Sequence, residues 1–171
     1  MKDEVKNELN SLINGYEERK VKQIKKFEAR KRKEDKFLKD FYLIRNKIIK
    51  PAMIEIGELL KSRGRKYQID EQDEIIDHEV KTKDARINIY FLIPEKGYES
   101  ELSEYPFVSF IADRRKKKIA TQENTNSPNR RGHSGGTGSY PISQITTDLV
   151  HQKIMNVLKE LFWGLNNSKD E

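Results

Sequence analysis

The chain has 171 residues, a formal net charge of +6, and more charged (36%) than hydrophobic (35%) residues. This length holds one ordinary domain with an appendage rather than two full cores, and the shortage of apolar side chains means that part of the chain cannot be core. The chain has no cysteine, which excludes disulfides, thiolate metal sites and cysteine nucleophiles.

The start of the chain mixes acidic and basic residues, with no apolar stretch of signal-peptide length behind it, so we expect no secretion signal. No run of about 18 apolar residues occurs, so we expect no membrane span. Together with the absence of cysteine, these features favour a cytoplasmic protein.

A helix is predicted from Val5 onward, because the apolar residues up to Tyr16 are spaced by steps of three and four. The pair Asn14-Gly15 favours an interruption of this helix. Charged residues dominate from 17 to 40, where a weak apolar seam continues at Val21, Ile24 and Phe27.

We expect residues 1–36 to form a charged helical arm. An isolated helix is only marginally stable in water, so a second copy or a partner protein is one source of its stability, as in a coiled coil. The alternative is a solvated single helix held by side-chain pairs such as Glu28 with Arg32.

Residues 37–171 are expected to form the globular domain, because apolar residues become denser from Phe37. Pro51 predicts a kink or a restart of the helix, since proline lacks the amide hydrogen and clashes with the preceding turn. Gly64 follows Lys61 and Arg63 and predicts the end of that second helical segment.

Beyond Gly64 the apolar period changes from helical to two, which predicts strands. The expected strands cover 67–69, 76–80, 87–93 and 107–112, and a basic hairpin tip at 114–118 leads into an edge strand at 119–123. Residues 125–139 are rich in Gly, Ser and Asn and are expected to form a flexible loop. Thr146 or Thr147 is expected to cap an amphipathic helix that has Asp148 in its first turn and apolar residues from Val150 to Leu165 along one face.

The predicted fold class is therefore α+β. A long charged N-terminal helix, kinked or broken near Pro51, leads into a four- to five-stranded antiparallel sheet. Helices cover this sheet, among them the C-terminal amphipathic helix.

Three groups of basic residues are candidates for binding DNA or RNA, because clustered cations displace counterions from a phosphate backbone. The alternative is an ordinary solvated surface, since acidic residues are interspersed and no zinc-finger or RNP-like pattern accompanies the charge. The candidate residues are Arg30, Lys31, Arg32 and Lys33; Arg114, Arg115, Lys116, Lys117 and Lys118; and Arg130 and Arg131.

The glycine-rich stretch ending at Ser139 precedes a helix, as phosphate-binding loops do. It lacks the Lys and Ser or Thr that a P-loop requires after the last glycine, because Tyr140 and Pro141 follow. A dinucleotide-binding fingerprint follows the first strand of a parallel sheet, whereas this stretch follows all the predicted strands. We therefore expect no cofactor.

An acidic strip from Asp70 to Glu79, followed by Lys81, resembles in composition the carboxylates and lysine of a two-metal nuclease. An exposed hairpin explains the same strip. The histidines His78, His133 and His151 are scattered without ligand spacing, so we expect no metal site.

The sequence thus favours a non-enzymatic assembly subunit. It would associate with itself or a protein partner through its N-terminal helix and present a basic surface, with DNA or RNA as the candidate ligand. The alternative is a metal-dependent nuclease or another phosphate-handling enzyme.

Overall fold

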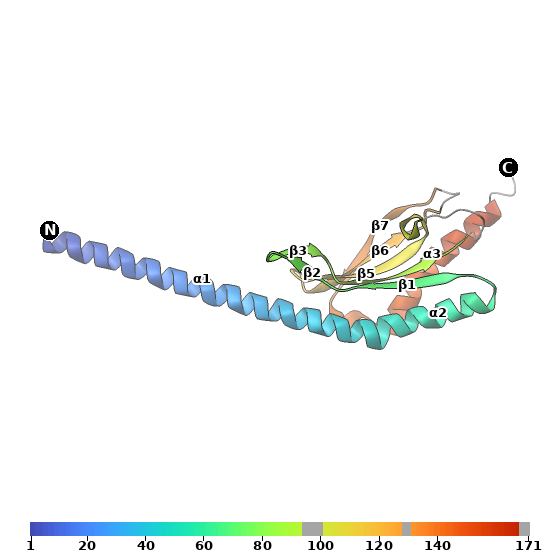
Figure 1. The fold of residues 1–171 in the computed structure, drawn as a ribbon, viewed down its shortest axis with the longest axis horizontal. Helices are drawn as coiled ribbons and strands as arrows, with labels where there is room; N and C mark the ends of the chain where they lie inside the picture. The colour runs from blue at the N-terminus through green and yellow to red at the C-terminus, as the bar shows by residue number, and fades with distance from the viewer. Residues whose placement is uncertain (94–100, 128–130, 168–171) are drawn as a thin grey trace. The chain divides into compact units, whose positions relative to one another are not determined.

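A computed structural model describes residues 1–93, 101–127 and 131–167, with side chains described as far as Trp163. Its internal contacts divide the chain into two compact units, Met1–Phe37 and Leu38–Glu171. The predicted α+β class is confirmed, with a long N-terminal helix, a five-stranded antiparallel sheet and a C-terminal helix (Figure 1). Within the described residues, no helix is long and apolar enough to cross a bilayer.

The helical elements are α1 (Asp3–Ile44), the π-helical segment η1 (Arg45–Ile49), α2 (Lys50–Ser62), the short 3-10 helices η2 (Leu102–Glu104) and η3 (Ile142–Gln144), and α3 (Thr147–Asn167). The strands are β1 (Tyr67–Gln72), β2 (Ile75–Asp77), β3 (Val80–Lys83), β4 (Arg86–Phe91), β5 (Phe107–Asp113), β6 (Lys118–Asn124) and β7 (Ser134–Tyr140).

Helix α1 runs without a break through Asn14 and Gly15, so the predicted interruption is wrong. A glycine inside a helix costs only about 1 kcal/mol relative to alanine. The strong helix formers that follow, among them Glu17, Glu18 and Arg19, outweigh this cost.

Of the predicted kink or restart near Pro51, the structure shows a restart. The hydrogen-bond pattern changes to a π-helix over Arg45–Ile49, and Pro51 lies in the first turn of α2. The wider π turn accommodates a proline that can neither donate a hydrogen bond nor tolerate a close carbonyl behind it. Helix α2 ends at Ser62, and Gly64 adopts the left-handed conformation (φ 74°) that the sequence predicted for this helix end.

The five-stranded sheet has the order β1-β4-β5-β6-β7, and every neighbouring pair is antiparallel. The single strand expected at 76–80 is wrong, because β2 and β3 form a separate two-stranded hairpin there. The chain reverses at His78 and Glu79, which both have positive φ (47° and 65°). Two successive positive φ angles are typical of a tight hairpin turn whose twist matches that of its strands.

Strand β6 was expected at the edge, but it lies between β5 and β7. The last six residues of the stretch expected as a flexible loop at 125–139 instead belong to strand β7. Backbone amides and carbonyls make the ladder, so a segment of Gly and Ser can pair once a neighbouring strand is in place. Side chains reinforce the pairing, since the Thr121 and Thr137 hydroxyls lie 3.0 Å apart. Residues 128–130 of the predicted loop lie outside the described part of the chain.

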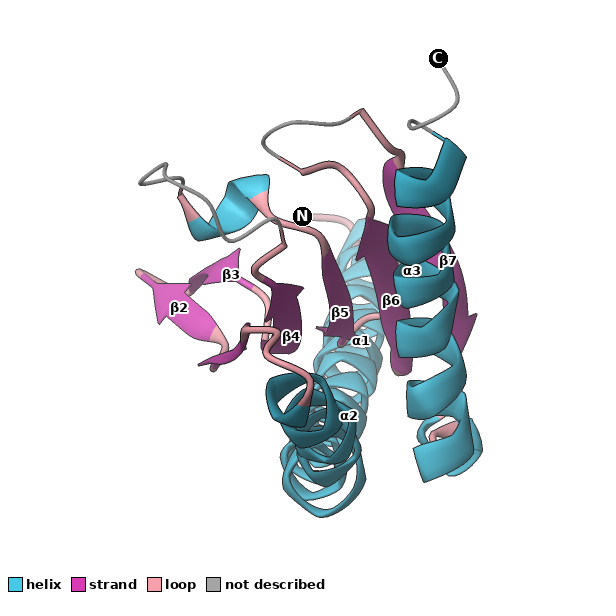
Figure 2. Cartoon of the chain, turned by 90° about the vertical axis from the view of Figure 1, so that its right-hand side faces the viewer, coloured by secondary structure: helices cyan, strands magenta, loops and turns pink. Residues whose placement is uncertain are grey.

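Helices α2 and α3 cover one face of the sheet and contact each other (Figure 2). That face buries alternate residues of the central strands, and the helices meet it with their own apolar stripes. The buried residues are Ile87, Ile89 and Phe91 on β4, Val108, Phe110 and Ala112 on β5, Ala52, Met53 and Leu60 on α2, and Val150, Ile154, Val157, Leu158 and Leu161 on α3. The Leu149 amide donates to the Thr146 hydroxyl at 3.2 Å, which confirms the predicted cap of α3.

Candidate functional site

The unit Met1–Phe37 presents a row of large apolar side chains to solvent. Every residue from Met1 to Lys33 is exposed, except for the partly exposed Gly15. We name the apolar members of this row the α1 stripe; each is between 45% and 62% exposed: Val5, Leu9, Leu12, Ile13, Tyr16, Val21, Ile24 and Phe27. Scattered exposed apolar residues are normal on a protein surface, whereas a row of them at helical spacing is a candidate interaction surface.

Two ion pairs and one cation–ring contact on the exposed surface of α1 are loose. Arg30 and Glu34 are 3.8 Å apart, Arg32 and Glu28 are 3.9 Å apart, and the Arg30 guanidinium lies 5.6 Å from the centre of the Phe27 ring. Such exposed pairs contribute at most a few tenths of a kcal/mol each. They therefore support the helix without replacing a packing partner.

The four candidate nucleic-acid residues from Arg30 to Lys33 are all exposed. Successive helical residues point about 100° apart, so these four cations surround the helix instead of forming one patch. Any single flat ligand would therefore reach only some of them.

The turn between β5 and β6 separates its candidate basic residues into two classes. Arg114 is only 14% exposed in its side chain, and its Nη1 donates to Oε1 of Glu74, whose side chain is 5% exposed. Arg115, Lys116, Lys117 and Lys118 are exposed. Arg114 is thus occupied by a buried carboxylate, while the four residues after it are available to a ligand.

Arg131 is exposed at the start of the segment that leads into β7. Arg130, the other candidate of the predicted loop, lies outside the described residues. Of the pair Arg130 and Arg131, the described structure therefore shows only Arg131 as an exposed cation.

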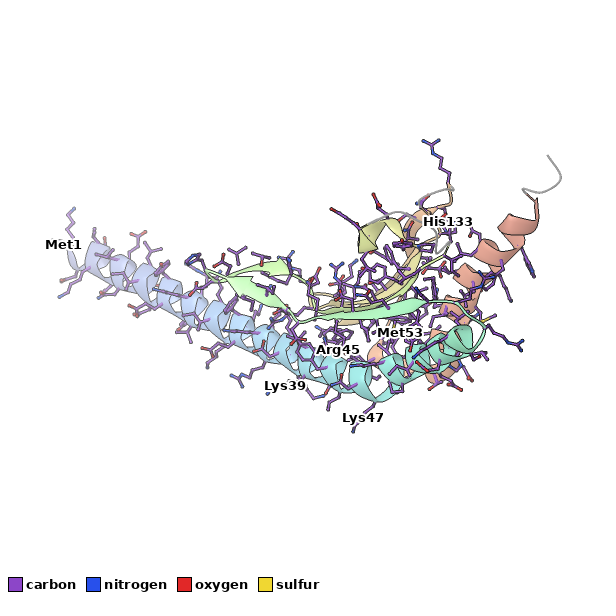
Figure 3. The ribbon with its side chains drawn as sticks, turned by 45° about the vertical axis from the view of Figure 1, so that its right-hand side comes forward. Met1, Lys39, Arg45, Lys47, Met53 and His133 are labelled. Atoms are coloured by element: carbon purple, nitrogen blue, oxygen red, sulfur yellow. The ribbon has the colours of Figure 1, made fainter. Side chains whose placement is uncertain are left out.

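The acidic strip is largely occupied by ion pairs with basic residues of the same unit. Arg45, which is buried, lies 2.8 Å from the Asp73 carboxylate and 3.6 Å from that of Glu71, and its guanidinium covers the Tyr42 ring at 4.8 Å. Lys50 pairs with Glu71 at 2.9 Å. Figure 3 shows Arg45 on the side of the helix that faces the sheet and Lys47 on the opposite side.

These pairings, with that of Glu74 to Arg114, give half of the six carboxylates of the strip a structural role. Among the residues that the structure describes, no three or more His, Asp or Glu side chains are grouped to hold a metal ion. His78 is 96% exposed in its side chain at the tip of the β2–β3 hairpin, and Asp77 is its nearest carboxylate at 3.4 Å.

One polar cluster resembles a nucleophile relay in composition. The Thr125 hydroxyl donates to Glu160 Oε1 at 2.8 Å, and Nδ1 of His133 lies 3.1 Å from Glu160 and 3.2 Å from the same hydroxyl. A relay needs the hydroxyl on one ring nitrogen and the carboxylate on the other. Here both partners share Nδ1, so the cluster fastens the segment before β7 to α3 and does not activate Thr125.

A basic groove between α2 and β1 was missed in the sequence, where Lys61 and Arg63 served only as helix-end signals. The groove encloses about 510 Å³, and its basic lining residues are Lys50, Lys61, Arg65 and Lys66. Its apolar lining includes Ile54, Ile69 and Leu92. The run KSRGRK at 61–66 was the signal available for it.

Tyr67 forms one wall of this groove, and its ring packs directly on Gly57 of α2. Its hydroxyl donates to Glu58 Oε1 at 2.7 Å. This hydrogen bond, with smaller contributions from burial and from the Glu58 charge, raises the pKa of Tyr67 to about 12. The phenol therefore stays protonated at any physiological pH and acts as a structural donor.

Comparison with known proteins gave no match to a family model, to a curated protein or to a solved structure. The geometry of the molecule itself therefore carries the functional argument.

Proposed function

We propose that this protein is an assembly subunit that associates with other protein chains through the α1 stripe. The single observation that carries the proposal is the row of eight large apolar side chains on Met1–Phe37, each 45% to 62% exposed. Its members lie at helical spacing over more than twenty residues, so one helix laid along α1 can contact most of them.

Two physical arguments support association. Burying exposed apolar side chains against a partner is favourable, and the free energy gained is roughly proportional to the apolar area removed from water. Helical segments also gain most of their stability from packing an amphipathic face, and the loose ion pairs on α1 supply little in its place.

Light scattering of the intact protein tests the proposal. We expect a molar mass above that of one chain, falling to one chain on dilution, and a return to monomer when Leu9 and Ile24 are both changed to Gln. A mass of one chain at every concentration, with no change in the variant, would argue against assembly through this stripe.

A second function, binding to the phosphate backbone of DNA or RNA, is favoured by the exposed cations. Lys116 and Lys117 extend from the β5–β6 turn, and Lys61, Arg65 and Lys66 surround the α2–β1 groove. No base-reading motif accompanies these residues, so we expect affinity that falls steeply with salt and depends little on sequence.

Fluorescence anisotropy with labelled single- and double-stranded oligonucleotides at low salt tests this second function. Changing Lys116 and Lys117 to Gln is expected to weaken binding and to reduce the slope of log affinity against log salt by about two, near one for each lost phosphate contact. Changing the exposed Lys39 and Lys47 to Gln removes the same two charges elsewhere and is the control for net charge. No binding at low salt would remove this function.

A further inference from the structure

The unit Met1–Phe37 has an uneven charge distribution along its axis. Residues 1–18 contain five acidic and two basic side chains, whereas residues 19–37 contain ten basic and three acidic ones. The α1 stripe extends through both halves, from Val5 to Phe27. The helix therefore has an acidic apolar half followed by a basic apolar half.

We infer that the α1 stripe is covered by the same stripe of a second copy of this chain, in antiparallel orientation. This inference rests on the assembly proposed above and adds to it the partner and the geometry. In an antiparallel pair, the acidic half of each helix lies beside the basic half of the other, so opposite charges flank the apolar contact on both sides of its centre.

Parallel pairing in register is opposed by the same charges. It would place the two basic halves side by side, with Arg30 and Lys31 of one helix, which lie three and four residues after Phe27, next to the same residues of the other. Like charges at this spacing repel, and repulsion over a whole segment is a common means of excluding one coiled-coil orientation.

The spacing of the stripe also fits an antiparallel pair. If the two-fold axis of the antiparallel pair passes between Tyr16 and Glu17, Leu9 is level with Ile24 of the other helix and Leu12 is level with its Val21. Val5 then lies within one residue of the level of Phe27, a displacement of about 1.5 Å along the axis. The three large apolar side chains of the basic half thus each meet one from the acidic half, and Ile13 and Tyr16 lie near the centre of the pair.

The absence of cysteine from the chain makes a direct test available. Three single variants are made in the 171-residue chain: Leu9→Cys, Ile24→Cys and Tyr16→Cys. A disulfide forms readily only where the two Cα atoms come within about 7 Å, so the products under a glutathione buffer report which positions are adjacent.

We expect a mixture of Leu9→Cys and Ile24→Cys to give the disulfide between positions 9 and 24, while each of these variants alone stays reduced. Tyr16→Cys lies near the centre in either orientation and is the positive control for pairing. The dimer should also dissociate more readily as salt is raised, because screening weakens the attraction between unlike halves.

The contrary outcomes are distinct from one another. An oligomer in which Leu9→Cys alone forms its disulfide is parallel, and an oligomer that gives no 9–24 product pairs in some other way; either result overturns this inference and leaves the assembly intact. A monomeric mass at every concentration overturns both the inference and the proposed function. Circular dichroism of each variant shows whether its helix content has been kept.

Discussion

Replacing Leu9 by Gln should weaken self-association by a predictable amount. Leu9 lies on the α1 stripe and is 47% exposed in the isolated chain. Glutamine is nearly as good a helix former as leucine, so the change removes apolar area from the contact and leaves the helix and the net charge as they were.

The magnitude follows from the exposed area. Burying a whole leucine side chain is worth about 1.5–3 kcal/mol, so burying the exposed half is worth about 1 kcal/mol. A symmetric dimer loses this twice, or about 2 kcal/mol, which corresponds to roughly a 30-fold increase in the dissociation constant. Self-dissociation of this kind can be followed by sedimentation equilibrium over a range of concentrations.

Ser11→Gln is the matched control, because Ser11 is exposed and lies about 200° around the helix from Leu9. It introduces the same side chain outside the stripe and should leave the dissociation constant within about twofold, the range of ordinary surface substitutions. Equal effects of the two substitutions would refute the assignment of the contact to this face of α1.

Three other predictions concern the unit Leu38–Glu171. Gly57→Ala should lower the stability of the fold in thermal denaturation, because a Cβ atom at this position would lie 2.3 Å from the Tyr67 ring. Alanine normally favours a helix over glycine, so a stabilised variant would show that the ring moves freely. Arg114→Ala should destabilise the fold by about 3–5 kcal/mol in urea denaturation, because it leaves the buried Glu74 carboxylate without its ion-pair partner, and an unchanged midpoint would contradict that pairing. Glu58→Gln should lower the pKa of Tyr67 from about 12 toward 10 in an NMR titration of the tyrosine ring carbons. Because the pKa of Tyr67 is raised in the folded state, the stability that this hydrogen bond contributes is complete below pH 10 and is lost as pH rises through about 12. A pKa that stays near 12 in the variant would show that another group raises it.

The sequence by itself determined the features that depend on neighbours along the chain. Step lengths of three and four predicted α1, the proline at 51 predicted its break, and the change of period after Gly64 predicted the central strands. The α1 stripe was visible for the same reason, since a helix places residues three and four apart on one face whatever else the chain does.

Tertiary structure decided the features that depend on residues far apart in the sequence. The Gly- and Ser-rich segment from Ser134 became a strand because β6 offered its backbone hydrogen bonds, which no local preference encodes. The acidic strip and Arg114 had the composition of a ligand site, and pairing with Arg45, Lys50 and Glu74 made them structural. Composition fixes which charges a chain carries, but only the fold fixes which of them it neutralises internally, because ion pairing depends on distance in space.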